Sequence, residues 1–331
     1  LQLQAYDALG SYDGAVVVME PETGRILAMV SKPDFDPNTI ADDWDTFVSD
    51  DSDSSVLLNR ATQGLYPPGS TFKIFTTLEY IHENADYADY HFDCSGEYTV
   101  GTKTIHCHNN KRHGSEDLKT SFANSCNSSY ASLGLTLDLE QFDDLCDQML
   151  FNTALPTDFE SSKSSFVLEP GDSDSAVMET SIGQGKTLVT PFHMALIASA
   201  IANDGVLMKP YVIDHITDAE GEVVEQYEPA EYKTLLSESD ASVLQEYMRY
   251  VVEEGTATKL KSDSYEAAGK TGSAEFSSSS DATHSWFVGY AHNGEEPDIA
   301  VAVIVENSGV GSEYAVPIAK QIFDAYYTWE N

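Results

Sequence analysis

A serine and a lysine stand three residues apart in the stretch PPGSTFK, residues 67–73. Residues i and i+3 of a helix share one face, so Ser70 and Lys73 would be neighbours on a helix. A serine hydroxyl becomes an effective nucleophile when a base removes its proton, and an amine can be that base when burial or a nearby cation lowers its pKa. Three apolar residues surround the pair: Phe72, Ile74 and Phe75. The alternative is a solvated helix lysine, although Ser70 is the only serine with a lysine at this spacing.

The second polar pair is Ser125 and Asn127 in the stretch NSCNSSY. Serine and asparagine often cap helices, so the pair taken alone says little about function. Its position is more informative, because it falls at the break between two helical patterns, where side chains can be presented into a cleft.

The third group lies in the stretch AAGKTGSAEF, which contains Lys270, Thr271, Gly272 and Ser273 on an expected strand. A glycine inside a strand often marks the close approach of a ligand or another backbone. A lysine followed by hydroxyl groups beside such a glycine would suit an anionic part of a substrate. The alternative is an edge strand with a protective lysine.

The elements that would hold these residues form a mixed pattern. Apolar alternation around a turn at Gly24 predicts a hairpin over residues 14–33. Three strand-like stretches near the C-terminus predict an antiparallel meander over residues 265–276, 284–293 and 298–307. The expected fold class is therefore α+β, with a five-stranded antiparallel sheet flanked by helices.

Helical patterns fill the middle of the chain. A helix is expected over residues 67–85, and a mostly helical subdomain at about residues 93–189 is inserted between the sheet portions 1–92 and 190–331. Further helices are expected to begin at Thr190 and at Ser237 or Ser239, where serine and threonine favour caps. We expect residues 34–58 to form a polar excursion on the surface, and residues 211–228 to form a second hairpin.

The excess of acidic residues disfavours one class of binding partner. The 331 residues contain 17 Lys and Arg against 55 Asp and Glu, a formal net charge of -38. Such a surface repels phosphate groups, so nucleic-acid binding is disfavoured. No apolar stretch is long enough for a membrane span, and the first residues, which lack a starting Met, do not resemble a signal peptide. We expect a part of a longer protein.

The cysteines allow two interpretations. Cys94 and Cys107 bracket a short expected hairpin, where they would form a disulfide, as in an oxidising compartment, or a free buried pair. Three histidines nearby raise a metal alternative: His106, His108 and His113. Their spacing matches no familiar zinc pattern, so we expect neither a metal nor a cofactor.

The three motifs, S-x-x-K, S-x-N and K-T-G in this order, are shared by the penicillin-recognising serine enzymes. The sequence resembles the transpeptidase domain of class B (monofunctional) penicillin-binding proteins over its whole length, which implies a single domain over residues 1–331. Other stretches carry the same resemblance, among them GAVVVMEPETGRILAMVSKPDFDPN and SIGQGKTLVTPFHMALIASAIANDG. β-Lactamases are shorter and lack the second of these.

The resemblance implies a role for each matching residue. Ser70 would be the acylated nucleophile and Lys73 the base that accepts its proton. Ser125 would relay a proton to the leaving amine, and Asn127 would hydrogen-bond the backbone amide of the substrate. Lys270 would set the electrostatics of the pocket and help to keep Lys73 neutral.

The same resemblance assigns substrate binding to the K-T-G stretch, Gly272 included. Thr271 and Ser273 would bind the terminal carboxylate, and the backbone N–H groups of Ser70 and Ser273 would form the oxyanion hole. Ser273 stands where threonine is common in the family, but it keeps the hydroxyl group, so we expect activity.

The implied reaction is peptidoglycan D,D-transpeptidation, with stem peptides as substrates and β-lactams as acylating inhibitors. A membrane glycosyltransferase would be the partner. The implied location is the extracytoplasmic face of a bacterial membrane, held by an N-terminal anchor and pedestal outside this chain. A D,D-carboxypeptidase or β-lactamase-type hydrolase, or a β-lactam receptor without turnover, remains an alternative. No glutamate has a recognisable deacylating setting among Glu160, Glu169 and Glu179.

Overall fold

The computed structural model describes residues 1–49, 55–275, 283–294 and 297–329, and its centre is one five-stranded sheet. Neighbouring strands are all antiparallel, in the order β11-β12-β13-β1-β2. The strands are β1 (Gly14–Met19), β2 (Ile26–Lys32), β11 (Glu266–Glu275), β12 (Thr283–His292) and β13 (Ile299–Val305). This confirms the α+β class and a sheet built from both ends of the chain. Phe276, which ends one expected strand, lies outside the described residues.

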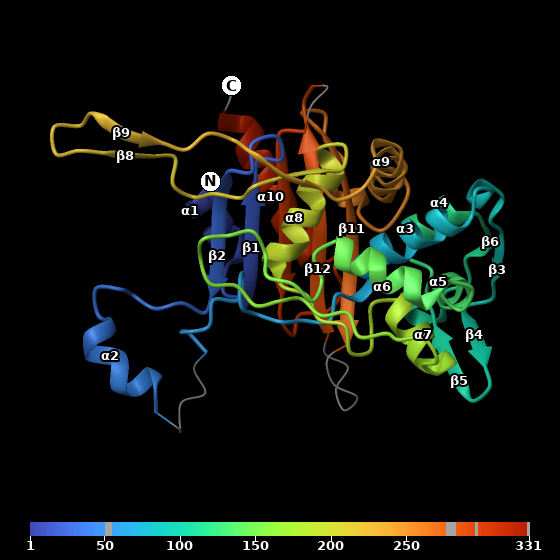
Figure 1. The fold of residues 1–331 in the computed structure, drawn as a ribbon. Helices are drawn as coiled ribbons and strands as arrows, with labels where there is room; N and C mark the ends of the chain where they lie inside the picture. Colours follow the sequence, from blue (N-terminus) through green and yellow to red (C-terminus); the bar gives the residue numbers. More distant parts are fainter. Residues whose placement is uncertain (50–54, 276–282, 295–296, 330–331) are drawn as a thin grey trace.

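Helices cover both faces of the sheet, so β1 and β13 are buried along their whole length. On one face, α8 (Pro191–Ala202) packs against β1, β12 and β13 (Figure 1). On the other, α1 (Gln2–Leu9) and α10 (Ala315–Trp329) pack together and against the strands. The predicted start of α8 is confirmed, because the Thr190 hydroxyl accepts a hydrogen bond from the His193 backbone N–H at 3.1 Å.

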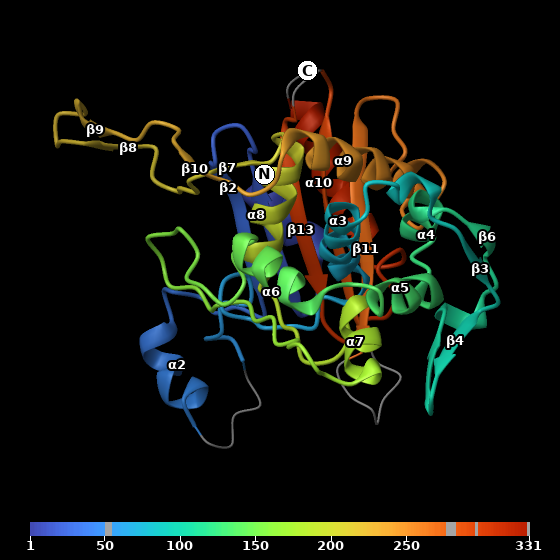
Figure 2. The ribbon, with the colours of Figure 1, turned by 45° about the vertical axis from the view of Figure 1, so that its right-hand side comes forward.

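A group of helices lies beside β11, at one end of the sheet (Figures 1 and 2). The 3₁₀ turn η1 continues directly into α3, which packs against α5, α6 and α9. The ring of Phe72 in η1 lies 5.2–6.1 Å from four other phenylalanine rings, and this cluster fixes the segment that contains Ser70. The elements are η1 (Gly69–Phe72), α3 (Lys73–Glu83), α4 (Leu118–Ala123), α5 (Asn127–Gly134), α6 (Leu139–Gln148), α7 (Asp174–Ser181) and α9 (Glu238–Glu253).

Two pairs of short strands form the outer edge of this helical group (Figure 2). The hairpin expected between Cys94 and Cys107 is confirmed as β4 and β5, and a second pair, β3 with β6, closes the chain around it. The strands are β3 (Phe92–Cys94), β4 (Glu97–Val100), β5 (Lys103–His106) and β6 (Gly114–Glu116). Three 3₁₀ turns complete the connections: η2 (Tyr87–Asp89), η3 (His108–Asn110) and η4 (Thr258–Leu260).

The stretch expected to be a polar excursion, residues 34–58, contains a helix that the sequence pattern did not predict. This helix, α2 (Ile40–Phe47), has no buried residue, so the sequence contains no buried apolar face from which to predict it. Its first turn carries Asp42 and Asp43, which favour a helix N-terminus. Residues 50–54 of the excursion lie outside the described part of the chain.

The second expected hairpin is confirmed and forms an arm that extends away from the body (Figure 1). Every residue of its strands β8 (His215–Thr217) and β9 (Val223–Gln226) is exposed. At its base, β7 (Val206–Met208) pairs with β10 (Glu231–Thr234). Within the described ranges, no helix has both the length and the apolar character needed to cross a bilayer.

Candidate active site

The backbone before Ser70 is shaped by two glycines in close contact. Gly69 has a φ of 53°, and its N–H donates a hydrogen bond to the Gly183 carbonyl at 2.9 Å. Gly183 has a φ of 79°, and a Cβ atom there would overlap the Gly69 carbonyl oxygen. A Cβ atom on Gly69 would lie 2.8 Å from the Ser273 carbonyl oxygen. Only glycine fits at both positions, and together they set Ser70 directly beside β11.

Lys73 is completely buried and its amine lies among four oxygen atoms. Its Nζ atom is 3.0 Å from Ser70 Oγ, 2.7 Å from Asn127 Oδ1, 2.9 Å from the Ser125 carbonyl oxygen and 3.2 Å from Ser125 Oγ. The Asn127 oxygen faces Lys73 because its Nδ2 donates to the His106 carbonyl at 3.0 Å. Two of these neighbours can only accept hydrogen bonds, so a neutral amine would donate both protons to them and keep its lone pair for a hydroxyl group.

The pKa of Lys73 supports this chemistry. Burial lowers it to about 8, while the nearby thiols of Cys126 and Cys107 and the carboxylate of Glu116 act in the opposite direction. Burial also lowers the pKa of Lys270, and the charge of Lys73 lowers it further. Two ammonium groups in this site therefore disfavour each other, and one of the two lysines is readily neutral.

Ser125 joins the two lysines. Its hydroxyl oxygen lies 3.0 Å from Lys270 Nζ and 3.2 Å from Lys73 Nζ. The residue lies between α4 and α5, as expected from the break in the helical pattern, and it has a φ of 56°. A positive φ is uncommon for serine and marks a backbone that its surroundings hold in place. The structure thus brings Ser70, Lys73, Ser125, Asn127 and Lys270 together from three separate parts of the chain.

The remaining predicted residues lie on β11. The Thr271 hydroxyl is 2.6 Å from the hydroxyl of Thr256, and Ser273 Oγ accepts a hydrogen bond from the Gly311 N–H at 3.2 Å. A Cβ atom on Gly272 would lie 3.0 Å from the Pro68 carbonyl oxygen, so glycine allows β11 to approach the segment before Ser70.

Sequence reasoning missed several residues that hold this strand or the segment before Ser70. Gln184 Nε2 donates to the Ser273 carbonyl at 3.4 Å, and Trp286 Nε1 donates to the Pro67 carbonyl at 3.0 Å. The SIGQG stretch, which includes Gly183 and Gln184, was a signal for the family but not for a contact with β11. For Thr256 and Gly311 the sequence carries no signal, because single residues become neighbours of β11 only in the folded chain.

A group of sulfur atoms lies next to the site. Cys94 Sγ and Cys126 Sγ each lie 3.7 Å from Cys107 Sγ, and Cys94 Sγ is 3.4 Å from His113 Nδ1. All four cysteines are buried free thiols in the structure. Of the two arrangements considered for Cys94 and Cys107, a disulfide or a free buried pair, the structure has the free pair. The sequence placed His113 near that pair, as part of the metal alternative, but carried no signal that connects Cys126 with it.

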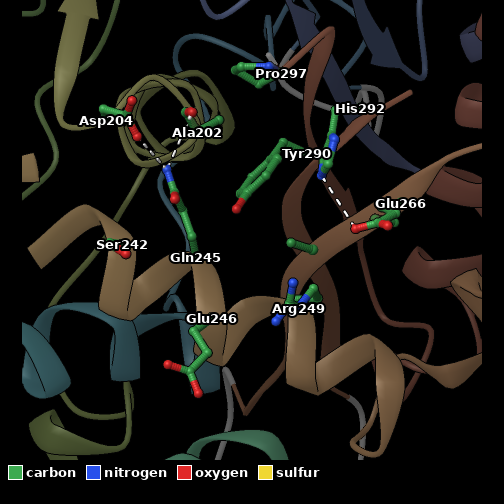
Figure 3. Close-up of a pocket in the computed structure, with 12 residues that line it drawn as sticks. Ala202, Asp204, Ser242, Gln245, Glu246, Arg249, Glu266, Tyr290, His292 and Pro297 are labelled. Atoms are coloured by element: carbon green, nitrogen blue, oxygen red, sulfur yellow. Dashed lines mark hydrogen bonds and ion pairs between the residues drawn. The ribbon is translucent and has the colours of Figure 1, made fainter. Parts of the chain in front are cut away.

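A separate hollow of about 460 Å³ lies between α9 and the start of β11 (Figure 3). Several of its polar side chains are paired: Gln245 Nε2 donates to the Ile201 carbonyl at 2.8 Å, and His292 Nε2 lies 3.8 Å from Glu266 Oε2. None of the motif side chains lines it, and its contacts hold α9 against α8 and the sheet.

The geometry places the protein among enzymes that form a covalent serine intermediate with a lysine as base. The comparison with known families makes this specific. Residues 14–324 match the family described as "Penicillin binding protein transpeptidase domain". The chain belongs to this family, as the resemblance implied.

Individual relatives agree with the family. The chain is 30% identical to the peptidoglycan D,D-transpeptidase PbpA of Mycolicibacterium smegmatis, over 97% of this chain and 69% of the relative. It is 28% identical to the peptidoglycan D,D-transpeptidase MrdA of Acinetobacter baumannii, over 98% of this chain and 52% of the relative. The chain thus spans only part of the length of these relatives.

Solved structures give the same result. The D,D-transpeptidase domain of a peptidoglycan glycosyltransferase from Eggerthella lenta superposes with a TM-score of 0.89 at 30% identity, covering 98% of this chain and 81% of that one. A ceftriaxone acyl-enzyme of penicillin-binding protein A from M. tuberculosis gives a TM-score of 0.89 at 28% identity, covering 98% and 77%.

Proposed function

We propose that the protein is a peptidoglycan D,D-transpeptidase that cross-links stem peptides through an acyl-enzyme on Ser70. The observation that carries this proposal is the continuous row of short contacts from Ser70 through Lys73 and Ser125 to Lys270. A row of this kind can remove a proton at one end and deliver it at the other. The peptidoglycan transpeptidases among the relatives, and the β-lactam acyl-enzyme among the structural neighbours, support the same reaction.

Acylation begins with the neutral amine of Lys73. It takes the proton of Ser70 Oγ as this oxygen attacks the carbonyl between two D-alanines. The backbone N–H groups of Ser70 and Ser273 stabilise the oxyanion, which the close packing of η1 against β11 makes feasible. Thr271 and Ser273, on the strand that carries Lys270, hold the terminal carboxylate.

Collapse of the tetrahedral intermediate breaks the peptide bond. Ser125 Oγ gives its proton to the leaving D-alanine amine and regains one from Lys73, so the proton taken from Ser70 leaves with the product. Asn127 hydrogen-bonds the substrate amide. The amine of a neighbouring stem peptide then attacks the acyl-enzyme and loses its proton through the same groups, which restores Ser70.

The location and partners belong to the same proposal. We place the domain at the extracytoplasmic face of a bacterial membrane, where peptidoglycan is assembled, with a membrane glycosyltransferase as partner and the anchor outside this chain. The relatives named as peptidoglycan D,D-transpeptidases, which extend beyond the region matched here, support this placement. The inserted subdomain over residues 93–189 contributes Ser125 and Asn127, so we propose that the site forms where it meets the sheet portions.

Penicillin labelling followed by peptide mapping tests the proposal. Trypsin cuts after Arg60 and Lys73, so one penicilloyl group is expected on the peptide of residues 61–73. Ser70→Ala should abolish labelling, whereas Ser242→Ala, a change at an exposed serine of α9 outside the motifs, should leave it intact. Label on another peptide would overturn the assignment of Ser70.

The lifetime of the label separates the alternatives. A transpeptidase keeps its penicilloyl group for many minutes without an acceptor amine, whereas release within seconds would indicate a β-lactamase-type hydrolase. Product analysis with a D-Ala-D-Ala stem peptide and an added acceptor amine completes the test. Cross-linked product supports the proposal, hydrolysed product alone indicates a carboxypeptidase, and a stable label without either product indicates a receptor.

A further inference from the structure

Four side chains that can bind a metal meet beside the active site. Cys94, Cys107, His113 and Cys126 each offer one ligand atom, and these atoms all lie within 4.8 Å of one another. The three cysteines are buried and the histidine is partly buried. The residues come from the end of β3, the chain after β5, the chain before β6 and the N-cap of α5. So dense a group of thiol and imidazole ligands is typical of a metal site.

The separations of the ligand atoms suit a tetrahedral zinc ion. Zinc–sulfur bonds of about 2.3 Å and zinc–nitrogen bonds of about 2.0 Å give tetrahedral edges of about 3.8 Å between sulfurs and about 3.5 Å between sulfur and nitrogen. The structure has two sulfur–sulfur separations of 3.7 Å and one sulfur–nitrogen separation of 3.4 Å. The Cys₃His set is also a common structural zinc set.

Each of the three sulfur atoms also has a hydrogen-bond donor. Backbone N–H groups donate to two of them, from Gly96 to Cys94 at 3.4 Å and from Ser129 to Cys126 at 3.5 Å. The Ser128 hydroxyl lies 3.2 Å from Cys107 Sγ. Donors of this kind orient metal-bound thiolates and stabilise their negative charge.

We propose that Cys94, Cys107, His113 and Cys126 bind one Zn²⁺ in a closed structural site. This proposal departs from the expectation of no metal, which rested on the spacing of Cys94, Cys107 and the three nearby histidines. The four ligands proposed here have the spacing C-x₁₂-C-x₅-H-x₁₂-C. That spacing contains no C-x-x-C pair, because two strand pairs rather than two tight turns bring the ligands together.

The metal site would affect catalysis by fixing the positions of Ser125 and Asn127. Cys126 stands between Ser125 and Asn127 in the chain, and Cys107 follows His106, whose carbonyl holds the Asn127 side chain at 3.0 Å. One ion bound to Cys107 and Cys126 would therefore fix both partners of this hydrogen bond. It would also hold Ser125 at its positive φ. Cys107 and Cys126 are thus positioning residues, and this consequence rests on the proposed function of Ser125 and Asn127.

Metal content is the first test, and it does not depend on activity. The protein purified with reductant and without chelator is expected to contain one zinc ion per chain. Replacement by Co²⁺ should give the strong visible and near-ultraviolet bands of a tetrahedral thiolate site. Less than about a tenth of an equivalent of zinc after incubation with zinc salt and gel filtration would overturn the proposal, if all four cysteines react with a thiol reagent once the protein is denatured and are therefore not oxidised.

Matched variants locate the ligands. Cys94→Ser and His113→Ala should each lower the zinc affinity at least tenfold. Cys146→Ala and His108→Ala change the same residue types outside the cluster and should retain one equivalent. A Cys94–Cys107 or Cys107–Cys126 disulfide in freshly prepared wild-type protein, found by peptide mapping without reduction, would contradict a resident metal.

Penicillin acylation separates this inference from the proposed function. Removal of zinc with a chelator should slow labelling of Ser70 about tenfold or more, and added Zn²⁺ should restore it. Unchanged labelling in metal-free protein would overturn the positioning role while the metal site stands. Absence of labelling in zinc-loaded wild type would instead count against the proposed function.

Discussion

Lys73 has the setting that a catalytic amine needs. Its side chain is fully buried, yet the Ser125 carbonyl and the Asn127 Oδ1 atom take two of its hydrogen bonds at 2.9 and 2.7 Å. The third direction leads to the Ser70 hydroxyl at 3.0 Å. Burial disfavours the charged amine, and the two acceptors orient the neutral one, so the amine already has the arrangement that the proposed base requires.

The acylation rate should therefore rise with pH. Burial lowers the pKa of Lys73 from 10.5 to about 8, and the neutral amine is the proposed base. Below this pKa the neutral fraction falls about tenfold per pH unit. The logarithm of the second-order rate constant for penicillin labelling should therefore rise with unit slope against pH and level off near pH 8. Stopped-time labelling with intact-mass readout measures it.

The control for this profile is Lys259→Ala, which removes an exposed lysine paired with Glu313 and should leave the curve unchanged. A wild-type rate that stays flat between about pH 6 and pH 8 would contradict Lys73 as the base.

At the level of elements, the contact between η1 and β11 forms the site. It depends on Gly183, whose Cβ atom would overlap the Gly69 carbonyl oxygen. The phenylalanine cluster around Phe72 holds the other side of η1. Ser70, the proposed nucleophile, is thus fixed between an aromatic core and a strand edge, and a shift of either element would move Ser70 relative to Lys270.

Gly183→Ala should harm both stability and acylation. The new methyl group meets backbone atoms that cannot move without displacing η1, and a left-handed φ costs a further 1–2 kcal/mol, roughly, for alanine. The matched control is Gly171→Ala, because Gly171 also has a positive φ, of 96°, but a Cβ atom there meets nothing within 4 Å.

Thermal unfolding and penicillin labelling of the two variants give the comparison. Gly171→Ala should lower the free energy of unfolding only by the cost of the left-handed φ, about 1–2 kcal/mol, and should be labelled at the normal rate. Equal loss of stability and equal labelling in both variants would show that the contact with Gly69 has no role.

Prediction from sequence succeeded where the signal is local. The sheet strands and α8 have continuous apolar patterns and recognisable caps, and S-x-x-K falls within one turn, so periodicity and spacing reveal them. The helix α2 has no buried face, and the grouping of Cys94 with Cys126 forms only after two strand pairs fold, so the sequence shows neither. Thr256 beside Thr271 is a third case, because a single hydroxyl partner leaves no pattern.

For the whole molecule, the charge is the dominant feature. The chain has a net charge of -38, whereas the two motif lysines of the site, Lys73 and Lys270, are fully buried. A substrate or β-lactam that carries a carboxylate must approach against this field before it reaches the hydroxyl groups of β11.

Salt should therefore speed acylation by an anionic penicillin. The Debye length falls from about 30 Å at 0.01 M salt to about 8 Å at 0.15 M, which screens the surface charge but not the buried contacts. We expect the second-order labelling rate to rise several-fold over this range. A zwitterionic cephalosporin is the control and should respond little. A rate for the penicillin that falls with salt would indicate that the local positive charge of the lysines outweighs the surface.

The arm between β7 and β10 has a practical consequence. Its two ends pair with each other at Met208 and Glu231, so the chain leaves the body and returns at one place. At its tip, Gly221 has open space around it, and Figure 1 places the arm on the side away from β3–β6. A fluorescent protein inserted at Gly221 would lie away from the proposed catalytic residues, and the fusion would let the enzyme be followed by light microscopy without a change at either end of this chain.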